Sequence, residues 1–285
     1  MYVLCSPCVL NPALRADGIT SQEDLGIFRN ARQRCEQFGI EMVPLPCPET
    51  LYLGPDRKPG TFLERLNTRE FFDVLDQLTS SVEKIIDQRG SPLLLLGVNS
   101  SPTCGVTSTY YGSTNGEPPK RAGRGVFLDR FPGIRAMDVA AFSRYRIYLA
   151  APLFSEAERT YNAKIAGMLT ASFFSVFVPQ DAGDDSATRS ENENARIFSG
   201  NTNALENSDI VVAIIDGPDA DSGTAWEMGY AYGIGKPVIA LRTDFRRAGE
   251  HEHVNLMLER SAIVVSGSRE LLEAVGSPGH IRTDR

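Results

Sequence analysis

Short apolar runs alternate with longer amphipathic segments along the first half of the chain. The apolar runs are typical of buried strands, and a hydrophobic period near 3.6 residues is typical of helices. These patterns predict strands at residues 1–4, 40–45 and 92–98, and helices at residues 21–38 and 68–89. Ser21 and Asp24 can cap the first of these helices. Because strand and helix alternate, we expect a mostly parallel sheet.

The second half repeats this alternation. It predicts strands at residues 146–150, 174–178, 210–216, 237–241 and 262–265, and helices at residues 155–171, 192–206 and 224–232 and from residue 269 onward. Ser155 and Glu158 fit a capping box. Residues 116–135 are rich in Gly, Pro and Arg, follow neither period, and predict a loop. We therefore expect an α/β fold with two Rossmann-like or flavodoxin-like domains, residues 1–140 and 141–285, each a mostly parallel sheet flanked by helices.

The net charge of the chain and its lack of long apolar runs limit the kinds of molecule that we expect the protein to bind. The net charge of -7 disfavours a surface that neutralises many phosphates of a nucleic acid polymer or an anionic membrane. No apolar run approaches the roughly 18 residues of a membrane-spanning helix, and the N-terminus has no basic region followed by a long apolar one. We expect a cytoplasmic protein that binds small molecules.

Acidic residues gather after the predicted strand at residues 210–216. Asp216, Asp219 and Asp221 precede a predicted helix that carries Glu227. Ligands of parallel α/β sheets bind beyond the carboxyl ends of the strands, so these carboxylates are candidate catalytic groups. The alternative is that Asp221 and Ser222 only cap the helix, while Glu227 favours its dipole.

The residues around these carboxylates carry a resemblance. Residues 207–216 (NSDIVVAIID), 221–231 (DSGTAWEMGYA) and 235–241 (GKPVIAL) resemble the central signature of the nucleoside 2-deoxyribosyltransferase family. Residues 147–154 (IYLAAPLF) look like the family's first strand, and residues 255–257 (NLM) look like a segment that enters a neighbouring subunit's site. All these pieces occur in the expected order.

The resemblance implies roles for matching positions. Glu227 would be the nucleophile that attacks C1′ of the sugar, Asp221 would handle the proton of the base, and Tyr148 would position Glu227 or the sugar. A carboxylate can stabilise the oxocarbenium-like transition state and then trap the sugar covalently. A second base that resolves this intermediate makes the enzyme a transferase, whereas water makes it a hydrolase. The glycosyl chemistry needs no cofactor.

Further positions would bind substrate. Asn201 stands where family members commonly carry an aspartate that binds the base. Some relatives hydrolyse deoxynucleoside monophosphates, and Ser222 and Gly223 would contact such a 5′-phosphate here, although Ser222 equally suits a helix cap. Asn255 would complete a neighbouring subunit's site, so we expect at least a homodimer.

All five cysteines lie in the first 104 residues. The odd number, without an export signal, favours thiols, a metal or a cluster over disulfides. Cys8, Cys47 and Cys104 each follow one of the three predicted strands, so we expect them at one end of the sheet. Their spacing leaves open buried thiols, a zinc site or an iron–sulfur cluster. We expect Cys35, in the middle of a helix, to be a core residue.

The segments around the three cysteines resemble the thiouracil desulfidase family. They are residues 8–18 (CVLNPALRADG), 47–49 (CPE) and 101–105 (SPTCG). The resemblance implies a 4Fe-4S cluster on Cys8, Cys47 and Cys104, whose fourth iron takes sulfur from a thiolated pyrimidine. Glu49 and Ser101 would be catalytic or would position the substrate. Val98 replaces a basic residue common in the family, and residues 54–62 depart from its pattern; Cys5 is a possible extra ligand.

Together these features predict an N-glycosyl transferase or hydrolase for nucleosides or nucleotides, fused to an iron–sulfur desulfidase-like domain. Two alternatives stay open. In one, motivated by Asn201, the protein is a non-catalytic nucleotide sensor with a structural cysteine domain. In the other, the glycosidase is active and the cysteine domain is structural. His251 and His253 could bind a metal, but two histidines in a charged loop are more typically solvated.

Overall fold

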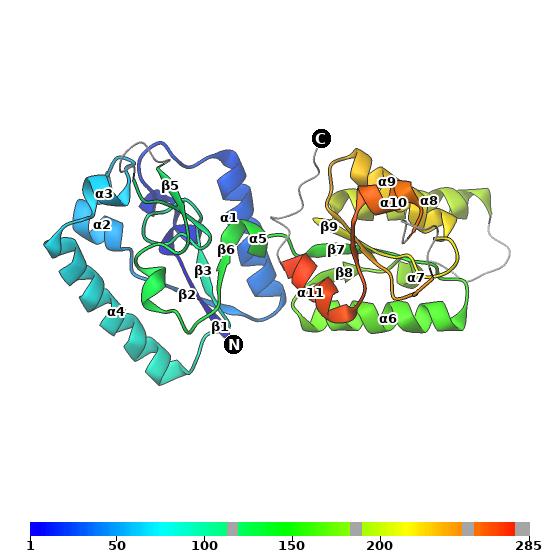
Figure 1. The fold of residues 1–285 in the computed structure, drawn as a ribbon, viewed down its shortest axis with the longest axis horizontal. Helices are drawn as coiled ribbons and strands as arrows, with labels where there is room; N and C mark the ends of the chain where they lie inside the picture. Colours follow the sequence, from blue (N-terminus) through cyan, green and yellow to red (C-terminus); the bar gives the residue numbers. More distant parts are fainter. Residues whose placement is uncertain (113–118, 183–189, 247–253, 277–285) are drawn as a thin grey trace. The chain divides into compact units, whose positions relative to one another are not determined.

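The computed structural model describes residues 1–112, 119–182, 190–246 and 254–276 (Figure 1). The chain forms two compact units, Met1–Ser143 and Arg144–Arg285. The candidate ligands His251 and His253 lie outside the described residues.

The first unit is built on a four-stranded parallel sheet in the order β2-β1-β3-β6. Its strands are β1 (Tyr2–Cys5), β2 (Glu41–Pro44), β3 (Leu95–Gly97) and β6 (Ala136–Asp138). The helices are α1 (Gln22–Gln37), α2 (Pro48–Leu53), α3 (Phe62–Arg65), α4 (Arg69–Arg89) and α5 (Val139–Phe142), with the short 3-10 turns η1 (Pro7–Val9), η2 (Pro12–Leu14) and η3 (Leu128–Arg130). The order of the strands reverses between β1 and β3, and such a switch point is where ligands of α/β sheets bind.

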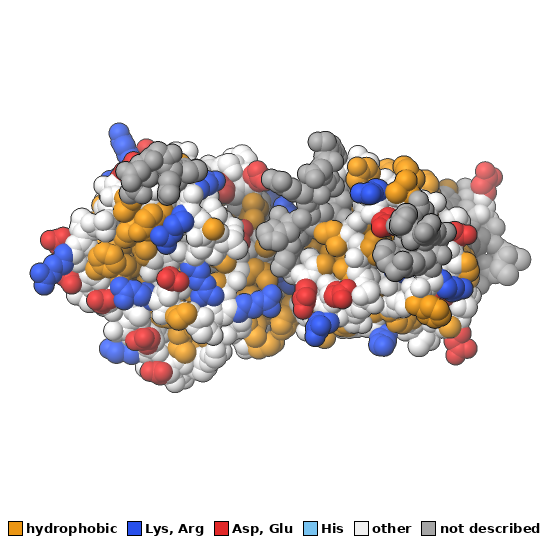
Figure 2. Space-filling model, in the orientation of Figure 1, with side chains coloured by type: hydrophobic (Ala, Val, Ile, Leu, Met, Phe, Trp, Pro, Cys, Tyr) orange, Lys and Arg blue, Asp and Glu red, His pale blue; other side chains and the backbone are white. Residues whose placement is uncertain are grey.

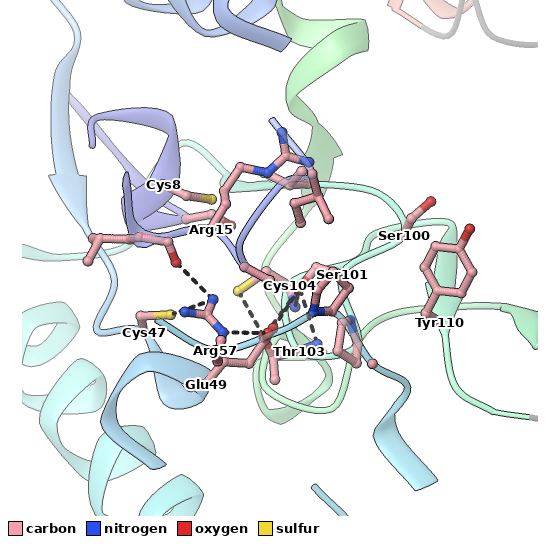
Figure 3. Close-up of a pocket in the computed structure, with 18 of the residues that line it drawn as sticks. Cys8, Arg15, Cys47, Glu49, Arg57, Ser100, Ser101, Thr103, Cys104 and Tyr110 are labelled. Atoms are coloured by element: carbon pink, nitrogen blue, oxygen red, sulfur yellow. Dashed lines mark hydrogen bonds and ion pairs between the residues drawn. The ribbon is translucent and has the colours of Figure 1, made fainter. Parts of the chain in front are cut away.

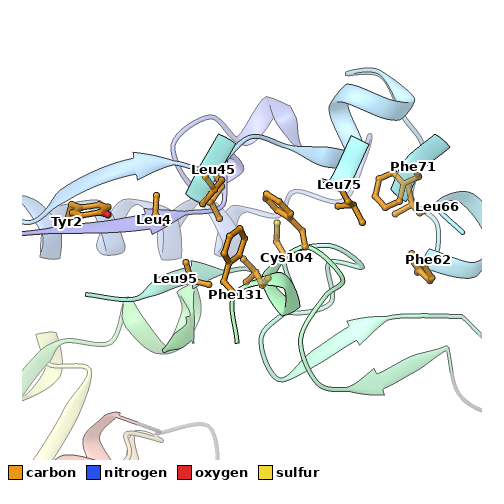
Figure 4. Packing of buried hydrophobic residues seen from close by; sticks show 13 residues of the cluster. Tyr2, Leu4, Leu45, Phe62, Leu66, Phe71, Leu75, Leu95, Cys104 and Phe131 are labelled. Atoms are coloured by element: carbon orange, nitrogen blue, oxygen red, sulfur yellow. The ribbon is translucent and has the colours of Figure 1, made fainter. Parts of the chain in front are cut away.

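Helices cover both faces of this sheet. Leu4 and Leu95 face α4, where they pack with the buried side chains of Phe71 and Leu75 (Figure 4). On the other face lie α1 and α5 (Figure 1). Each such side chain contributes roughly 1.5–3 kcal/mol when it is buried. This double cover explains why the two central strands, β1 and β3, are fully buried and carry no charged side chain.

The region after Cys104 differs from the prediction. The expectation of a loop over residues 116–135 is wrong, because β5 (Lys120–Ala122) pairs antiparallel with β4 (Ser108–Tyr110) and η3 forms a helical turn. All three residues of β5 are exposed, so this strand has no apolar period to detect. The edge strand β6 escaped prediction because it has only three half-buried residues.

The second unit contains a five-stranded parallel sheet in the order β11-β10-β9-β7-β8. Its strands are β7 (Arg146–Ala150), β8 (Ser175–Phe177), β9 (Ile210–Ile214), β10 (Val238–Leu241) and β11 (Ile263–Val265). Numbered within the unit, this order is 2-1-3-4-5, the flavodoxin-like arrangement, with its switch point between β7 and β9. The predicted α/β fold with parallel sheets is confirmed.

The helices of this unit also form two layers. They are α6 (Glu156–Ala171), α7 (Pro179–Ala182), α8 (Glu191–Asn207), α9 (Ser222–Gly233), α10 (Leu256–Ser261) and α11 (Ser268–Gly276). In Figure 1, α8, α9 and α10 lie on one face of the sheet, and α6 and α11 lie on the other. The predicted capping boxes at Ser21 and Ser155 are both present.

Acidic and basic side chains are interspersed over the face shown in Figure 2. In the part of the chain that the structure describes, no helix has the length and apolar character needed to cross a bilayer.

Candidate active sites

Two groups meet at the switch point of the second unit. Tyr148 is fully buried in β7, and Glu227 lies in the second turn of α9. The Tyr148 hydroxyl donates a hydrogen bond to Glu227 Oε1. The Phe177 ring of β8 stacks on the Tyr148 ring with a centroid distance of 5.5 Å, which fixes the orientation of the phenol. Strand and helix therefore hold one carboxylate in a defined position.

Burial changes the protonation of this pair. Desolvation raises the pKa of Glu227 to about 7; the Tyr148 hydrogen bond opposes this rise, and the charge of Asp221 adds to it. Burial, followed by the charge of Glu227, raises the pKa of Tyr148, so the phenol stays protonated and acts as the donor. Glu227 therefore changes its protonation state near neutral pH rather than near its usual value of 4.5.

Asp221 lies at the N-cap of α9. Its Oδ2 accepts hydrogen bonds from Thr224 N, at 2.9 Å, and from Thr224 Oγ1, at 3.3 Å. Both bonds use the same carboxylate oxygen, Oδ2. Asp221 also contributes to the pKa of Glu227, which shows that the two carboxylates interact. Ser222 and Gly223 follow in the exposed first turn of α9.

The other two acidic residues of the loop have different surroundings. Asp216 accepts hydrogen bonds from Thr243 N and Oγ1, both at 2.6 Å, and from Asp244 N at 2.8 Å. Asp216 therefore fixes the loop that follows β10. Asp219 is exposed. Of the four carboxylates, Asp221 and Glu227 form the electrostatically coupled pair.

The two candidate asparagines lie on other helices. Asn201 is half-buried on α8, one turn after Phe198, whose ring packs 5.6 Å from the Trp226 ring of α9. Asn255 is exposed, and its Oδ1 accepts a hydrogen bond from Met257 N at the start of α10. The exposed position of Asn255 is compatible with contact to a second copy of the chain.

In the first unit, Cys8, Cys47 and Cys104 line one cavity of about 590 Å³ (Figure 3). They follow β1, β2 and β3 respectively, and β1 and β3 flank the switch point. Loop packing is tight here, because a Cβ atom on Gly97 would lie 2.4 Å from the Cys104 carbonyl oxygen. All three cysteines are free thiols. Cys5 is fully buried in β1, and Cys35 is buried in α1 as expected.

Burial holds two of these thiols in their neutral form. Desolvation, followed by the charge of Cys47, raises the pKa of Cys8 to about 12. Desolvation and then Cys47 also raise the pKa of Cys104, an effect that the nearby hydroxyls of Ser6 and Thr103 oppose. A bound metal group would supply the positive charge that turns such thiols into thiolate ligands.

Arg57 connects the loops that carry the cysteines. Its guanidinium is buried and donates to Leu14 O at 2.8 Å, to Thr50 Oγ1 at 2.9 Å and to Glu49 Oε2 at 3.2 Å. The same group lies 3.9 Å from Cys47 Sγ. Sequence patterns missed Arg57, because it comes from a loop without a periodic signal and makes its contacts only in the folded chain.

Glu49 extends this network to the third cysteine loop. Its Oε1 accepts hydrogen bonds from Thr103 Oγ1, at 2.7 Å, and from Ser101 Oγ, at 3.2 Å. Ser101 Oγ in turn accepts from Cys104 N at 3.0 Å. Glu49 and Ser101 are therefore in direct contact beside the cysteines, and Thr103 joins them. The sequence showed Thr103 only as part of the segment SPTCG.

Comparison with known proteins finds a family match within the second unit. Residues 147–261 match the model of the nucleoside 2-deoxyribosyltransferase family. An uncharacterised protein of Methanocaldococcus jannaschii is 28% identical over 107 residues, which cover 36% of this chain and 63% of that protein, less than two thirds of its length.

Two solved structures resemble parts of the chain. A 2-deoxyribosyltransferase from Bacillus psychrosaccharolyticus is 26% identical, with a TM-score of 0.40, and the alignment covers 44% of this chain and 89% of that one. A [4Fe-4S]-dependent thiouracil desulfidase is 20% identical, with a TM-score of 0.33, and the alignment covers 48% of this chain and 89% of that one.

The donor groups of the cysteine cavity can be compared with the needs of an iron–sulfur cluster. Among the described residues, no group of three or more His, Cys, Asp or Glu side chains is arranged to hold a metal ion. Three free thiols nevertheless line one cavity, and such thiols are the ligands that a cluster takes. Within the described residues, the buried Ser6 hydroxyl that lines the same cavity has no hydrogen-bond partner. The residues therefore fit a sulfur-rich group that accepts hydrogen bonds.

Proposed function

We propose that the second unit breaks, and in the presence of a second base remakes, the N-glycosidic bond of a nucleoside or nucleoside 5′-monophosphate, with Glu227 as nucleophile. The observation that carries this proposal is the hydrogen bond at the switch point between the half-buried Glu227 carboxylate and the fully buried Tyr148. A Glu227 oxygen attacks C1′ of the sugar as the bond from C1′ to the base breaks. The electron pair of that bond stays on the base nitrogen.

Asp221 completes the proton balance. Oδ1 of its protonated form gives a proton to the departing base, while the hydrogen bonds to Thr224 hold Oδ2. In the second step, Asp221 takes a proton from water or from the incoming base, which attacks C1′ and releases Glu227. Tyr148 positions Glu227 throughout. We further propose that Asn201, Ser222 and Gly223 bind the substrate.

The test uses wild type, Glu227→Gln and Asp221→Asn with a panel of deoxynucleosides and their 5′-monophosphates, with and without an acceptor base. Chromatography should show release or exchange of the base by wild type and a loss of roughly 1,000-fold or more in Glu227→Gln. The matched control is Asp216→Asn, because Asp216 contacts the β10 loop instead of Glu227. If wild type binds nucleotides but never releases a base, the protein is a nucleotide sensor and the proposal fails.

For the first unit, we propose a 4Fe-4S cluster on Cys8, Cys47 and Cys104, and removal of sulfur from a thiolated pyrimidine. The shared cavity of the three cysteines supports this assignment, as does the contact between Glu49 and Ser101. When bound on these three cysteines, the cluster would supply a thiophilic iron that accepts the sulfur at the sulfide level, and water would supply the oxygen that replaces it on the pyrimidine carbon. Glu49 accepts the Ser101 hydrogen bond and can hold a proton beside the cavity. Arg57 fixes the second oxygen of Glu49.

Anaerobic purification followed by iron and sulfide analysis tests the cluster. Wild type should carry iron and labile sulfide, and single Cys→Ser changes at positions 8, 47 and 104 should remove them. The control is Cys35→Ser, because Cys35 is buried in α1. Zinc, or no metal, in wild type would instead indicate a structural cysteine domain. Five free thiols also suit a reducing compartment, so we propose a cytoplasmic location.

We propose that the active form is at least a homodimer, in which Asn255 enters the neighbouring copy's site. Light scattering of wild type and Asn255→Ala, combined with base release at several protein concentrations, tests this assembly. A fully active monomer contradicts it.

A further inference from the structure

Ser6 lies in the turn between β1 and η1, and its whole side chain is buried. It lines the same cavity as Cys8 and Cys104. The main chain of Ser6 is fully used: its N–H donates to Leu96 O at 2.8 Å, and its carbonyl accepts from Val9 N at 3.0 Å. The backbone therefore fixes the position of the side chain beside the cysteines.

The hydroxyl has no structural task in the described chain. Ser6 is the N-cap residue of η1, yet its side chain makes no capping hydrogen bond. Across the described ranges, its Oγ has no hydrogen-bond partner. The hydroxyl and the Cys104 thiol line the same cavity. Among the described residues, the hydroxyl is therefore available to a group that occupies this cavity beside the cysteines.

A buried hydroxyl without a partner is unusual and costly. Leaving a buried donor unsatisfied costs about 1–3 kcal/mol, which corresponds to about a 5- to 150-fold change in an equilibrium constant. A neutral thiol is a weak acceptor, whereas a metal-bound thiolate or a sulfide is electron-rich and accepts a stronger hydrogen bond. The position of Ser6 therefore suits a loaded cysteine site better than an empty one.

We propose that Ser6 is a positioning residue of the cysteine site, whose hydroxyl donates a hydrogen bond to a sulfur of the bound iron–sulfur cluster at the Cys104 side. This inference rests on the proposed cluster and goes beyond its three ligands. Hydrogen bonds to the sulfurs help to set the reduction potential of a cluster and to retain the metal. Ser6 stabilises the loaded site, although the same hydroxyl destabilises the cluster-free chain.

The first arm of the test measures the cluster-free full-length chain. Hydrogen exchange of β1 and β3 peptides in increasing urea gives the stability of the first unit. Ser6→Ala should make global opening about tenfold rarer, because it removes an unsatisfied donor. The matched control is Ser143→Ala, since Ser143 is also buried but donates to Ala140 O at 2.8 Å. This control should open more often. If Ser6→Ala also opens more often, the inference is overturned.

The second arm measures the full-length protein after anaerobic reconstitution with iron and sulfide. Ser6→Ala should release iron to a ferrous chelator about tenfold faster than wild type. Its midpoint potential, followed by electron paramagnetic resonance, should become more negative, because a hydrogen bond to sulfur favours the reduced cluster. A purely structural serine, such as Ser143, should leave the potential unchanged.

The outcomes separate this inference from the proposed function. If wild type takes up iron and Ser6→Ala matches its iron release and potential, the inference fails and the cluster stands. If wild type takes up no iron or sulfide, the cluster and the inference both fail.

Discussion

Substitution of Glu227 by Gln should remove a pH dependence from the stability of the second unit. The pKa of Glu227 is raised from 4.5 to about 7, mainly by burial. Below pH 4.5 the carboxyl is protonated in both folded and unfolded chains. Between pH 4.5 and about 7 the folded chain keeps a proton that the unfolded chain has released, so wild-type stability declines as the pH rises through this window.

The size of the decline follows from the shift. A shift from 4.5 to about 7 corresponds to roughly 3 kcal/mol at 1.36 kcal/mol per pH unit. The glutamine side chain cannot ionise, so the stability of Glu227→Gln relative to wild type should rise by about this amount from pH 4.5 to pH 7 and stay level above it. Taking the difference between the two proteins cancels the titration of all other groups.

The chain provides its own probe for this measurement. Trp226 is the single tryptophan and precedes Glu227, so its fluorescence during urea unfolding reports on the second unit. The base-release rate of wild type should change in the opposite direction, rising with pH through about 7 as the nucleophile ionises. A stability difference that is constant from pH 4.5 to pH 8 would refute the reasoning, because Glu227 would then titrate alike in both states.

Three further predictions concern neighbouring groups. Tyr148→Phe keeps the ring stacked on Phe177 but removes the hydrogen bond that lowers the pKa of Glu227. The pH midpoint of base release, measured in a pH–rate profile, should therefore move upward by about one unit. Arg57→Met leaves the Glu49 carboxylate without its buried partner and should lower the stability of the first unit, measured by hydrogen exchange, by about 3–5 kcal/mol. The control Arg89→Met breaks an exposed ion pair and should change this stability little. Equal effects of the two substitutions would contradict the role of the Arg57 network. Gly97→Ala should destabilise the first unit and lower the yield of folded protein, because the new methyl group would meet the Cys104 carbonyl; wild-type urea stability would disprove this packing argument.

The sequence predicted the central strands of both sheets because these strands are buried on both faces. β1, β7 and β9 are continuous apolar runs, and the polar start signals at Ser21 and Ser155 lie close to the helices that they cap. The same patterns indicated which loops leave the carboxyl ends of the strands. This is why Cys8, Cys47 and Cys104 could be placed at one end of the sheet from the sequence.

Other features depend on contacts between distant segments. Arg57 reaches Leu14 and Glu49 only after three loops have packed together, and no local pattern records such a meeting. Likewise, the pKa of Glu227 is raised because the side chain is desolvated in the folded chain. The local sequence around Glu227 does not show this desolvation. The strand β5 is exposed and polar, so hydrogen bonding to β4 creates it without help from an apolar face.

The division of the chain at Ser143 has a consequence for its evolution. Every candidate group of the cysteine site precedes this point, and every candidate group of the glycosyl site follows it. A mutation that disables one site therefore leaves the other site's own residues intact, and selection can act on the two separately. Because both units belong to one chain, ribosomes produce them in a fixed ratio of one to one wherever and whenever the protein is expressed.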